Sequence, residues 1–285
     1  MAHVTGDGPT PFGDVLRVGP GFRLADVDPT STPGFDGKRR NAAELMTETD
    51  DELDDLQERL YADGTAGGTR AVLLVVQGMD TAGKGGIMRH VVGSVDPQGV
   101  QHTAFKAPSE EERAHDFLWR IHKALPHAGQ IGVFDRSHYE DVLIVRVRRL
   151  VPEAVWSARY EQINAFEAQV SAGGTEIVKV MLNISPEEQK LRLMSRLDRA
   201  DKHWKYNPGD TDERKLWDEY MQAYQVALER CTTDVAPWYV VPADRKWYAR
   251  LAVQQLLLER LRSMDPQWPA ATFDVTAEKR RLAAT

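Results

Sequence analysis

The chain has 285 residues, one cysteine and a formal net charge of −7, from 36 Lys and Arg against 43 Asp and Glu. This length suits one large α/β domain or two small ones, and it folds without a disulfide framework, while a single cysteine excludes a cysteine-based metal site. The acidic balance argues against general nucleic-acid binding, and no run has the length and apolar character of a membrane span.

The N-terminal part of the chain, residues 1–69, is predicted to be an extension before the core domain. Its first stretch, MAHVTGDGPTPFGDV, has no signal-peptide pattern, so we expect a cytoplasmic protein. Residues up to 40 are rich in Gly, Pro, Asp and Thr, which is typical of irregular surface chain. Leucines at helical spacing among acidic residues then predict a helix over 41–62 that packs on the core, and DGTAGGT ends it.

From residue 70 to about 268, short apolar runs alternate with helical patterns. The predicted strands are 71–77, 100–105, 130–135, 176–184 and 238–242. The predicted helices are 84–95, 109–125, 152–172, one that begins at Ser185, 212–231 and 245–264. This alternation indicates βαβ units and a mostly parallel five-stranded sheet in a three-layer α/β fold, with the ligand at the carboxyl ends of the strands. Residues 269–285 are expected to form a polar tail.

The stretch QGMDTAGKGG follows the first strand and opens a helix, as a phosphate-binding Walker A loop does. Gly78, Gly83 and Lys84 have the G-x-x-x-x-G-K spacing. The loop backbone, with Ala82 and Gly85, is predicted to cradle phosphate, and Lys84 to reach the transferred group. Gly85 stands where the motif has a Ser or Thr whose hydroxyl holds Mg²⁺.

Two carboxylates are predicted to replace that hydroxyl. Asp135 ends a strand, as a Walker B carboxylate does, and Asp80 lies inside the loop. Mg²⁺ prefers oxygen ligands, so we expect both to position one or two metal ions across the transferred phosphate. A general-base role for Asp80 is the alternative, for which an anionic phosphate acceptor has little need. Arg136, next to Asp135, is expected to neutralise phosphoryl charge.

A helix and loop further along the chain carry a row of cations, namely Arg192, Arg196, Arg199, Lys202 and Lys205. A mobile cationic segment over bound phosphates is typical of phosphotransferase lids, so a lid is predicted at about 196–214. The alternative is a solvated face on which neighbouring aspartates pair with these cations. His138 and His203 are expected to be structural or on the surface, and Cys231 to be a buried apolar residue.

The stretches LQERLYA, QGMDTAGKGG, FDRSHYEDVL and RLDRADKHWKYNPGD, in this order, resemble the polyphosphate kinase 2 family over roughly residues 25–268. The resemblance implies a P-loop kinase fold with a helical lid. It also implies reversible in-line transfer of phosphate between inorganic polyphosphate and nucleotides, with Mg²⁺ or Mn²⁺, in a homodimer or homotetramer.

The resemblance also assigns roles to individual residues. It implies metal and phosphate roles for Asp80 and Asp135, phosphate contacts for Lys84 and Arg136, and lid contacts for Arg196, Lys202 and Lys205. The stretch SHYEDVL is similar to that of the class III subgroup, which accepts AMP and ADP, and this makes Asp80 and Glu140 candidates for nucleotide binding.

Two other functions remain open from the sequence. An ATP-dependent nucleoside monophosphate kinase has the same fold and differs in its phosphate donor. A non-catalytic sensor of nucleotides or polyphosphate is the second alternative, but a pure binding protein does not need Lys84 together with the carboxylates Asp80 and Asp135.

Overall fold

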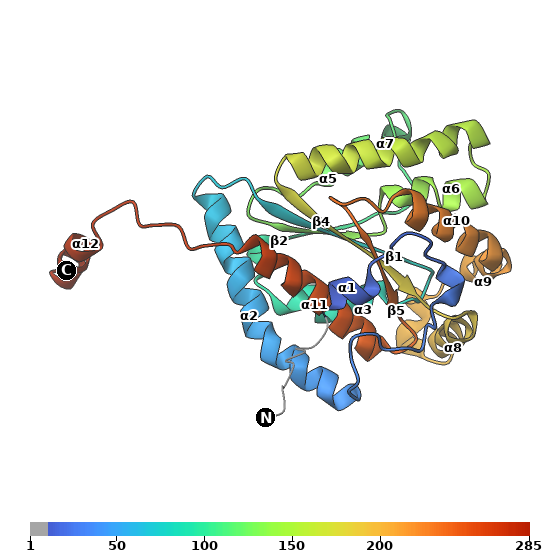
Figure 1. Cartoon of the computed structure of the whole chain (residues 1–285), viewed down its shortest axis with the longest axis horizontal. Coiled ribbons are helices and arrows are strands. Elements are labelled where there is room, and N and C mark those ends of the chain that lie inside the picture. The colour runs from blue at the N-terminus through green and yellow to red at the C-terminus, as the bar shows by residue number, and fades with distance from the viewer. Residues whose placement is uncertain (1–10) are drawn as a thin grey trace, which may run out of the picture.

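A computed structural model describes residues 11–285 and has a five-stranded parallel sheet at its centre (Figure 1). The strands lie in the order β2-β3-β1-β4-β5. Their bounds are β1 (Ala71–Gly78), β2 (Val100–Ala104), β3 (Ile131–Asp135), β4 (Thr175–Asn183) and β5 (Trp238–Pro242). Every residue of β1 is buried, as expected for a strand covered on both faces. The predicted α/β fold with five parallel strands is confirmed.

Helices cover both faces of this sheet (Figure 1). One layer holds α2 (Arg39–Thr65), α3 (Lys84–His90) and α11 (Lys246–Met264), and α2 packs along α11. The other layer includes α5 (Trp119–Ala124), α6 (Ile144–Val147), α7 (Glu153–Ala172) and α10 (Trp217–Arg230). The order of the strands reverses beside β1, so the ligand crevice is expected at the carboxyl ends of β1, β3 and β4.

The N-terminal segment is mostly irregular, as predicted, but it is anchored to the core. Its helix α1 (Phe12–Leu16) buries Phe12 and Leu16, and the backbone N–H of Phe12 donates to Glu259 at 2.7 Å. A 3-10 turn (Leu24–Asp26) follows, and Gln225 accepts from the N–H of Leu24 at 2.7 Å. The part of this prediction that concerns residues 1–10 lies outside the described residues.

Three predicted helices are shorter in the structure, and one of them, expected over 212–231, is interrupted by a 3-10 turn at Arg214–Leu216 before α10 begins. The helix expected over 84–95 ends at His90 and continues as a 3-10 turn (Val92–Ser94), because two valines and a glycine are poor helix formers. The helix expected over 109–125 is divided into α4 (Glu110–Arg113) and α5. Asp116 causes this break, since its side chain accepts from the N–H of Leu118 at 2.9 Å and competes with the helix.

The predicted lid region is built from short helices. They are α8 (Pro186–Leu197), a 3-10 segment (Ala200–Lys205), α9 (Gly209–Glu213) and a 3-10 turn (Arg214–Leu216) that leads into α10. Further 3-10 turns are Pro97–Gly99 and His138–Asp141. The expected polar tail contains a helix, α12 (Val275–Ala283). Within residues 11–285, no helix is both long and apolar enough to cross a membrane.

Candidate active site

The glycine loop leaves β1 in a conformation that two glycines make possible. Gly78 has φ 150°, and a Cβ there would lie 2.8 Å from the carbonyl oxygen of Leu182 on β4. Gly83 has φ 127°, which an L side chain rarely adopts. Lys84 begins α3 and folds back over the loop, where its Nζ donates to the carbonyl of Gly78 at 2.7 Å. The ammonium group of Lys84 thus lies against the backbone of the loop.

Arg192, which the sequence places in the cationic row, supports this loop from behind. Its Nη1 donates to the carbonyls of Thr81 and Ala82, both at 2.9 Å. Its Nη2 donates to the carbonyls of Ala243 and Asp244, and the side chain is nearly inaccessible to solvent. Arg192 is therefore a positioning residue for the loop and not a part of the exposed lid surface.

A cavity of about 540 Å³ opens in front of the loop, and we call it the cationic cavity. Its acidic residues are Asp80 and Asp135. Its basic residues come from α3, from the residue after β3, from the lid and from α11, and they are Lys84, Arg89, His90, Arg136, Arg196, Lys202, Lys205, Lys246 and Arg250. Such a wall favours a polyanion, even in a chain whose net charge is negative.

A second cavity of about 280 Å³ adjoins the first, and we call it the acidic cavity. Its charged residues are mainly carboxylates, namely Asp80, Glu140, Asp210, Asp212 and Glu213, together with Arg136 and Arg148. Tyr220 and Tyr224 of α10 add aromatic surface. Carboxylates accept hydrogen bonds from hydroxyl and amino groups, so this wall suits a sugar and a base.

Asp80 and Arg136 belong to the walls of both cavities. Arg136 donates from Nη2 to Oδ1 of Asp80 at 2.7 Å, and both side chains are about one-third exposed. The sequence predicted a metal role for one and a phosphate role for the other, and did not predict that they contact each other. The ion pair marks the place where ligands in the two cavities meet.

The electrostatics of the site are set by burial and by this cluster of charges. Burial lowers the pKa of Lys84, although Asp80 opposes the shift. Burial also acts to lower the pKa of Arg136, but Glu140 and Asp80 outweigh it, and the pKa is raised. Burial raises the pKa of Glu140 against the influence of Arg136 and Lys84. In its better-satisfied orientation, the amide of Gln77 donates to Glu140 at 3.1 Å.

The donor atoms present fit a magnesium ion that shares its ligands with a substrate. Within residues 11–285, no three His, Cys, Asp or Glu side chains converge on one point that could hold a metal. The two carboxylates Asp80 and Asp135 do line one cavity. Mg²⁺ is usually held by one or two carboxylates plus substrate phosphates and water, so this donor set is sufficient.

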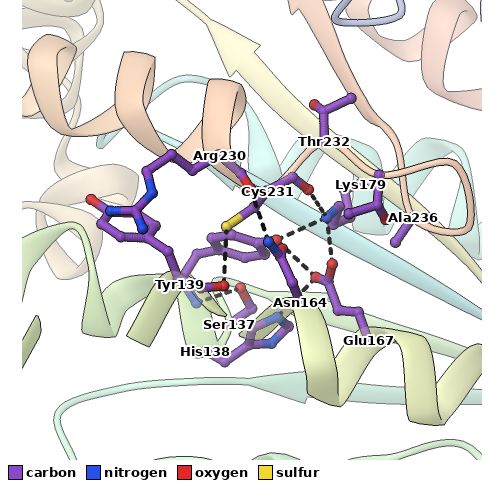
Figure 2. A network of polar contacts seen from close by, with 12 residues as sticks. Ser137, His138, Tyr139, Asn164, Glu167, Lys179, Arg230, Cys231, Thr232 and Ala236 are labelled. Atoms are coloured by element: carbon purple, nitrogen blue, oxygen red, sulfur yellow. Dashed lines mark hydrogen bonds and ion pairs between the residues drawn. The ribbon is translucent and has the colours of Figure 1, made fainter. Parts of the chain in front are cut away.

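A buried polar network lies behind the segment that carries Arg136 and Glu140 (Figure 2). Lys179 on β4 donates to Glu167 at 2.5 Å, to the hydroxyl of Tyr139 at 2.8 Å and to the carbonyl of Cys231 at 2.7 Å. Glu167 also contacts Nε2 of His138 at 3.1 Å. These side chains are inaccessible to solvent, and the network ties α7 and β4 to residues 138 and 139.

Burial sets the protonation of this network. Burial acts to raise the pKa of Glu167, but Lys179 and His138 outweigh it, so the pKa lies below its usual range. Burial lowers the pKa of His138, which keeps its ring neutral, and raises the pKa of Cys231 to about 12. His138 and Cys231 are buried, as the sequence analysis expected for structural residues.

Most of the predicted site residues line the cationic cavity or the acidic cavity, and a few do not. The residues of the cationic cavity include Asp80, Ala82, Gly83, Lys84, Gly85, Asp135, Arg136, Arg196, Lys202 and Lys205. Gly78 and Glu140 line the acidic cavity. Arg199 does not join them, because it pairs with Asp201 at 2.8 Å on the surface, as the alternative of a solvated face predicted.

The sequence analysis missed several residues of these walls. Arg89, Lys246 and Arg250 add cations to the cationic cavity, and Tyr220 and Tyr224 line the acidic one. They come from α3, α10 and α11, whose helical patterns gave no sign of which polar side would face the loop. Lys179 of the buried network was missed too, although the sequence contains a signal for it, namely a charged residue inside the apolar strand EIVKVMLNI.

The chain is similar to proteins of one family. The family model for polyphosphate kinase 2 matches residues 36–269. An AMP/ADP-polyphosphate phosphotransferase of Meiothermus ruber is 44% identical over 87% of this chain and 91% of its own length. An ADP-polyphosphate phosphotransferase of Rhodopseudomonas palustris is 43% identical over 90% and 92%. The crystal structure of polyphosphate kinase 2 from Arthrobacter aurescens TC1 is 55% identical, with a TM-score of 0.95 over 98% of this chain and 99% of that one.

Proposed function

The chain belongs to the polyphosphate kinase 2 family, and we propose from this premise that it transfers a phosphoryl group reversibly between inorganic polyphosphate and AMP or ADP. It is an enzyme, a polyphosphate-dependent nucleotide kinase. The observation that supports the proposal best is the cationic cavity beside the glycine loop. The curated relatives are named for both acceptors or for one of them. That this chain uses both AMP and ADP is therefore part of the proposal.

Polyphosphate is assigned to the cationic cavity. A chain of phosphates carries about one negative charge per unit, and a wall with cations from four elements can contact several units at once. Lys202 and Lys205 come from the lid, and Lys246 and Arg250 come from α11. Closure of the lid over the donor would exclude water from the reacting phosphate.

The acceptor nucleotide is assigned to the acidic cavity. Ribose hydroxyls and the adenine amino group are donors that Glu140, Asp210 and Glu213 can accept from, and the tyrosines of α10 can pack on a base. The acceptor phosphate then lies toward Arg136 and Asp80, which belong to both cavities. This arrangement brings donor and acceptor phosphates together at the ion pair.

The chain's own residues position the two phosphates and neutralise their charge. Lys84 and Arg136 contact the oxygens of the transferred group, while the loop backbone from Gly78 to Gly85 orients it. Asp80 and Asp135 would hold Mg²⁺ or Mn²⁺, which supplies positive charge between donor and acceptor when bound. The acceptor phosphate is already anionic near neutral pH, so no side chain has to remove a proton from it.

The test is nucleotide formation by the purified protein with Mg²⁺, polyphosphate and either AMP or ADP, and with no other phosphate donor. We expect ATP from ADP, and ADP followed by ATP from AMP. If product formed from ADP but not from AMP, polyphosphate would still be the donor, and ADP would be the only one of the two nucleotides that the protein accepts. Transfer from ATP to a nucleoside monophosphate without use of polyphosphate would instead show a nucleoside monophosphate kinase, and binding without turnover would show a sensor.

A further inference from the structure

The C-terminal arm, residues 267–285, stands away from the body of the molecule (Figure 1). Every residue of the arm is exposed, whereas Pro266 just before it is buried. The side chain of Trp268 lies 6.0 Å from the guanidinium of Arg59 at the base of the arm. The hydrogen bonds of residues 274–285 described by the structure stay within the arm.

The helix of this arm is too short to be stable by itself. Helix α12 has nine residues, and isolated helices of fewer than about 12–15 residues are marginal in water. Its cap at Asp274, which accepts from the N–H groups of Thr276 and Ala277, contributes only about 1 kcal/mol. A helix at this position therefore needs packing against another surface.

The arm also has large apolar side chains that are exposed. They are Trp268, Phe273, Val275 and Leu282, exposed by 50%, 61%, 44% and 76%. Val275 and Leu282 are seven residues apart and share one face of α12. The match to the Arthrobacter aurescens structure covers 98% of this chain, so it includes most of the arm.

The charge of α12 indicates what covers it. Lys279 and Arg280 have no ion-pair partner within residues 11–285, while Arg281 pairs with Glu278 at 3.3 Å. The outer part of α2 has the opposite charge, because residues 48–58, ETDDELDDLQE, include no cation. Glu48, Asp51 and Glu58 are exposed there, and no ion pair within residues 11–285 involves them. The arm therefore fits an acidic surface that this same chain supplies.

We propose that two copies of the chain exchange their C-terminal arms. In this arrangement α12 of each copy packs on the acidic face of α2 of the other copy, which carries Glu48, Asp51 and Glu58. The exchange buries the apolar face of α12 and pairs Lys279 and Arg280 with carboxylates of the partner's α2. Such a contact is reciprocal, so it closes as a two-fold symmetric dimer. It does not involve the cavities of the active site.

The first test is the molar mass of full-length charge variants by sedimentation equilibrium. The wild type is expected to have at least twice the 32.1 kDa mass of one chain. Lys279→Glu with Arg280→Glu should halve the mass, and Glu48→Lys with Asp51→Lys should do the same. All four changes together should restore it. Glu110→Lys with Glu111→Lys, on the exposed α4, is the matched control and should leave the mass unchanged.

The second test identifies the chain on which each arm lies. Cys231 is buried, so Ala277→Cys and Asp51→Cys would introduce the only reactive thiols. Co-expressed single variants with different tags should be joined by a bismaleimide into a species of twice the chain mass. A monomeric wild type would overturn the proposal. A cross-link confined to one chain in the double variant would also overturn it, because the arm would then pack on its own α2.

Discussion

The guanidinium of Arg136 donates to the carboxylate of Asp80 at 2.7 Å and so joins the glycine loop to the residue that follows β3. Arg136 has φ 62°, which is uncommon for a residue other than glycine, and its N–H donates to the carbonyl of Val76 at 3.1 Å. A cation bound to Asp80 and a phosphate bound to Arg136 both compete with this pair. Substrate binding is therefore expected to separate the two side chains.

Asp80→Asn is expected to lower kcat by about 100-fold or more, because the amide holds a metal ion poorly and no longer balances Arg136. The Mg²⁺ concentration at half-maximal rate should rise as well. Thermal unfolding should change little, since an ion pair that is one-third exposed contributes little to stability. Asp218→Asn, at an exposed position of α10 outside both cavities, is the control. Wild-type turnover in Asp80→Asn would rule out the metal role.

Lys84→Ala is expected to lower turnover by about 100-fold or more and to leave the fold intact, because Arg192 holds the loop backbone independently of Lys84. Circular dichroism and thermal unfolding check the fold, and a steady-state assay with polyphosphate measures turnover. Lys190→Ala, at an exposed position of α8, is the matched control. A folded Lys84→Ala enzyme with a near-normal rate would contradict the assignment of the loop.

Lys179→Met is expected to destabilise the protein by about 3–5 kcal/mol, because it leaves the carboxylate of Glu167 buried without its cation (Figure 2). The double variant Lys179→Met with Glu167→Leu should recover part of this loss, since a buried ion pair can be replaced by apolar side chains at little cost. Urea unfolding measures both. If the loss in the double variant equalled the sum of the losses in Lys179→Met and Glu167→Leu alone, the two residues would not act as a pair.

Asp141 provides a pH test. Burial raises the pKa of its carboxyl to about 6, against the opposing effect of Arg159, from a usual value of 3.8. A raised carboxyl pKa means that the folded state binds more protons than the unfolded state between these values, so wild-type stability falls as pH rises through them. Asp141→Asn lacks this loss and should gain up to about 3 kcal/mol relative to wild type between pH 4 and 7. The measurement is the free energy of unfolding of both proteins against pH. If the two curves ran parallel between pH 4 and 7, the raised pKa of Asp141 would be contradicted.

The sequence predicted the sheet well because the strands other than β2 are short, mostly apolar runs that are largely buried. The predicted bounds of β1, β3 and β5 lie within one residue of those observed. The helix predicted over 109–125 was wrong because one hydrogen bond, which the side chain of Asp116 accepts from the N–H of Leu118, outweighs an otherwise regular apolar spacing. Local competition of this kind depends on which rotamer the packed chain allows, and a spacing pattern does not contain that information.

The candidate site was predictable only as far as its motifs extend. The loop follows β1 and Asp135 ends β3, so their place at the carboxyl edge of the sheet follows from the topology. The division into a cationic and an acidic cavity does not, because it depends on residues from α3, α10 and α11 that meet only in the folded chain. Arg192 was assigned to the lid surface because helical spacing shows which residues share a face and not which face is buried.

We propose that polyphosphate and nucleotide occupy the two cavities on either side of Asp80 and Arg136. The most direct measurement is the KM for each substrate in Lys205→Ala, of the cationic cavity, and Glu140→Gln, of the acidic one. Lys205→Ala should raise the KM for polyphosphate several-fold and leave the KM for AMP unchanged, and Glu140→Gln should do the reverse. If each variant changed both KM values equally, or if the two effects were exchanged, the assignment of the cavities would be wrong.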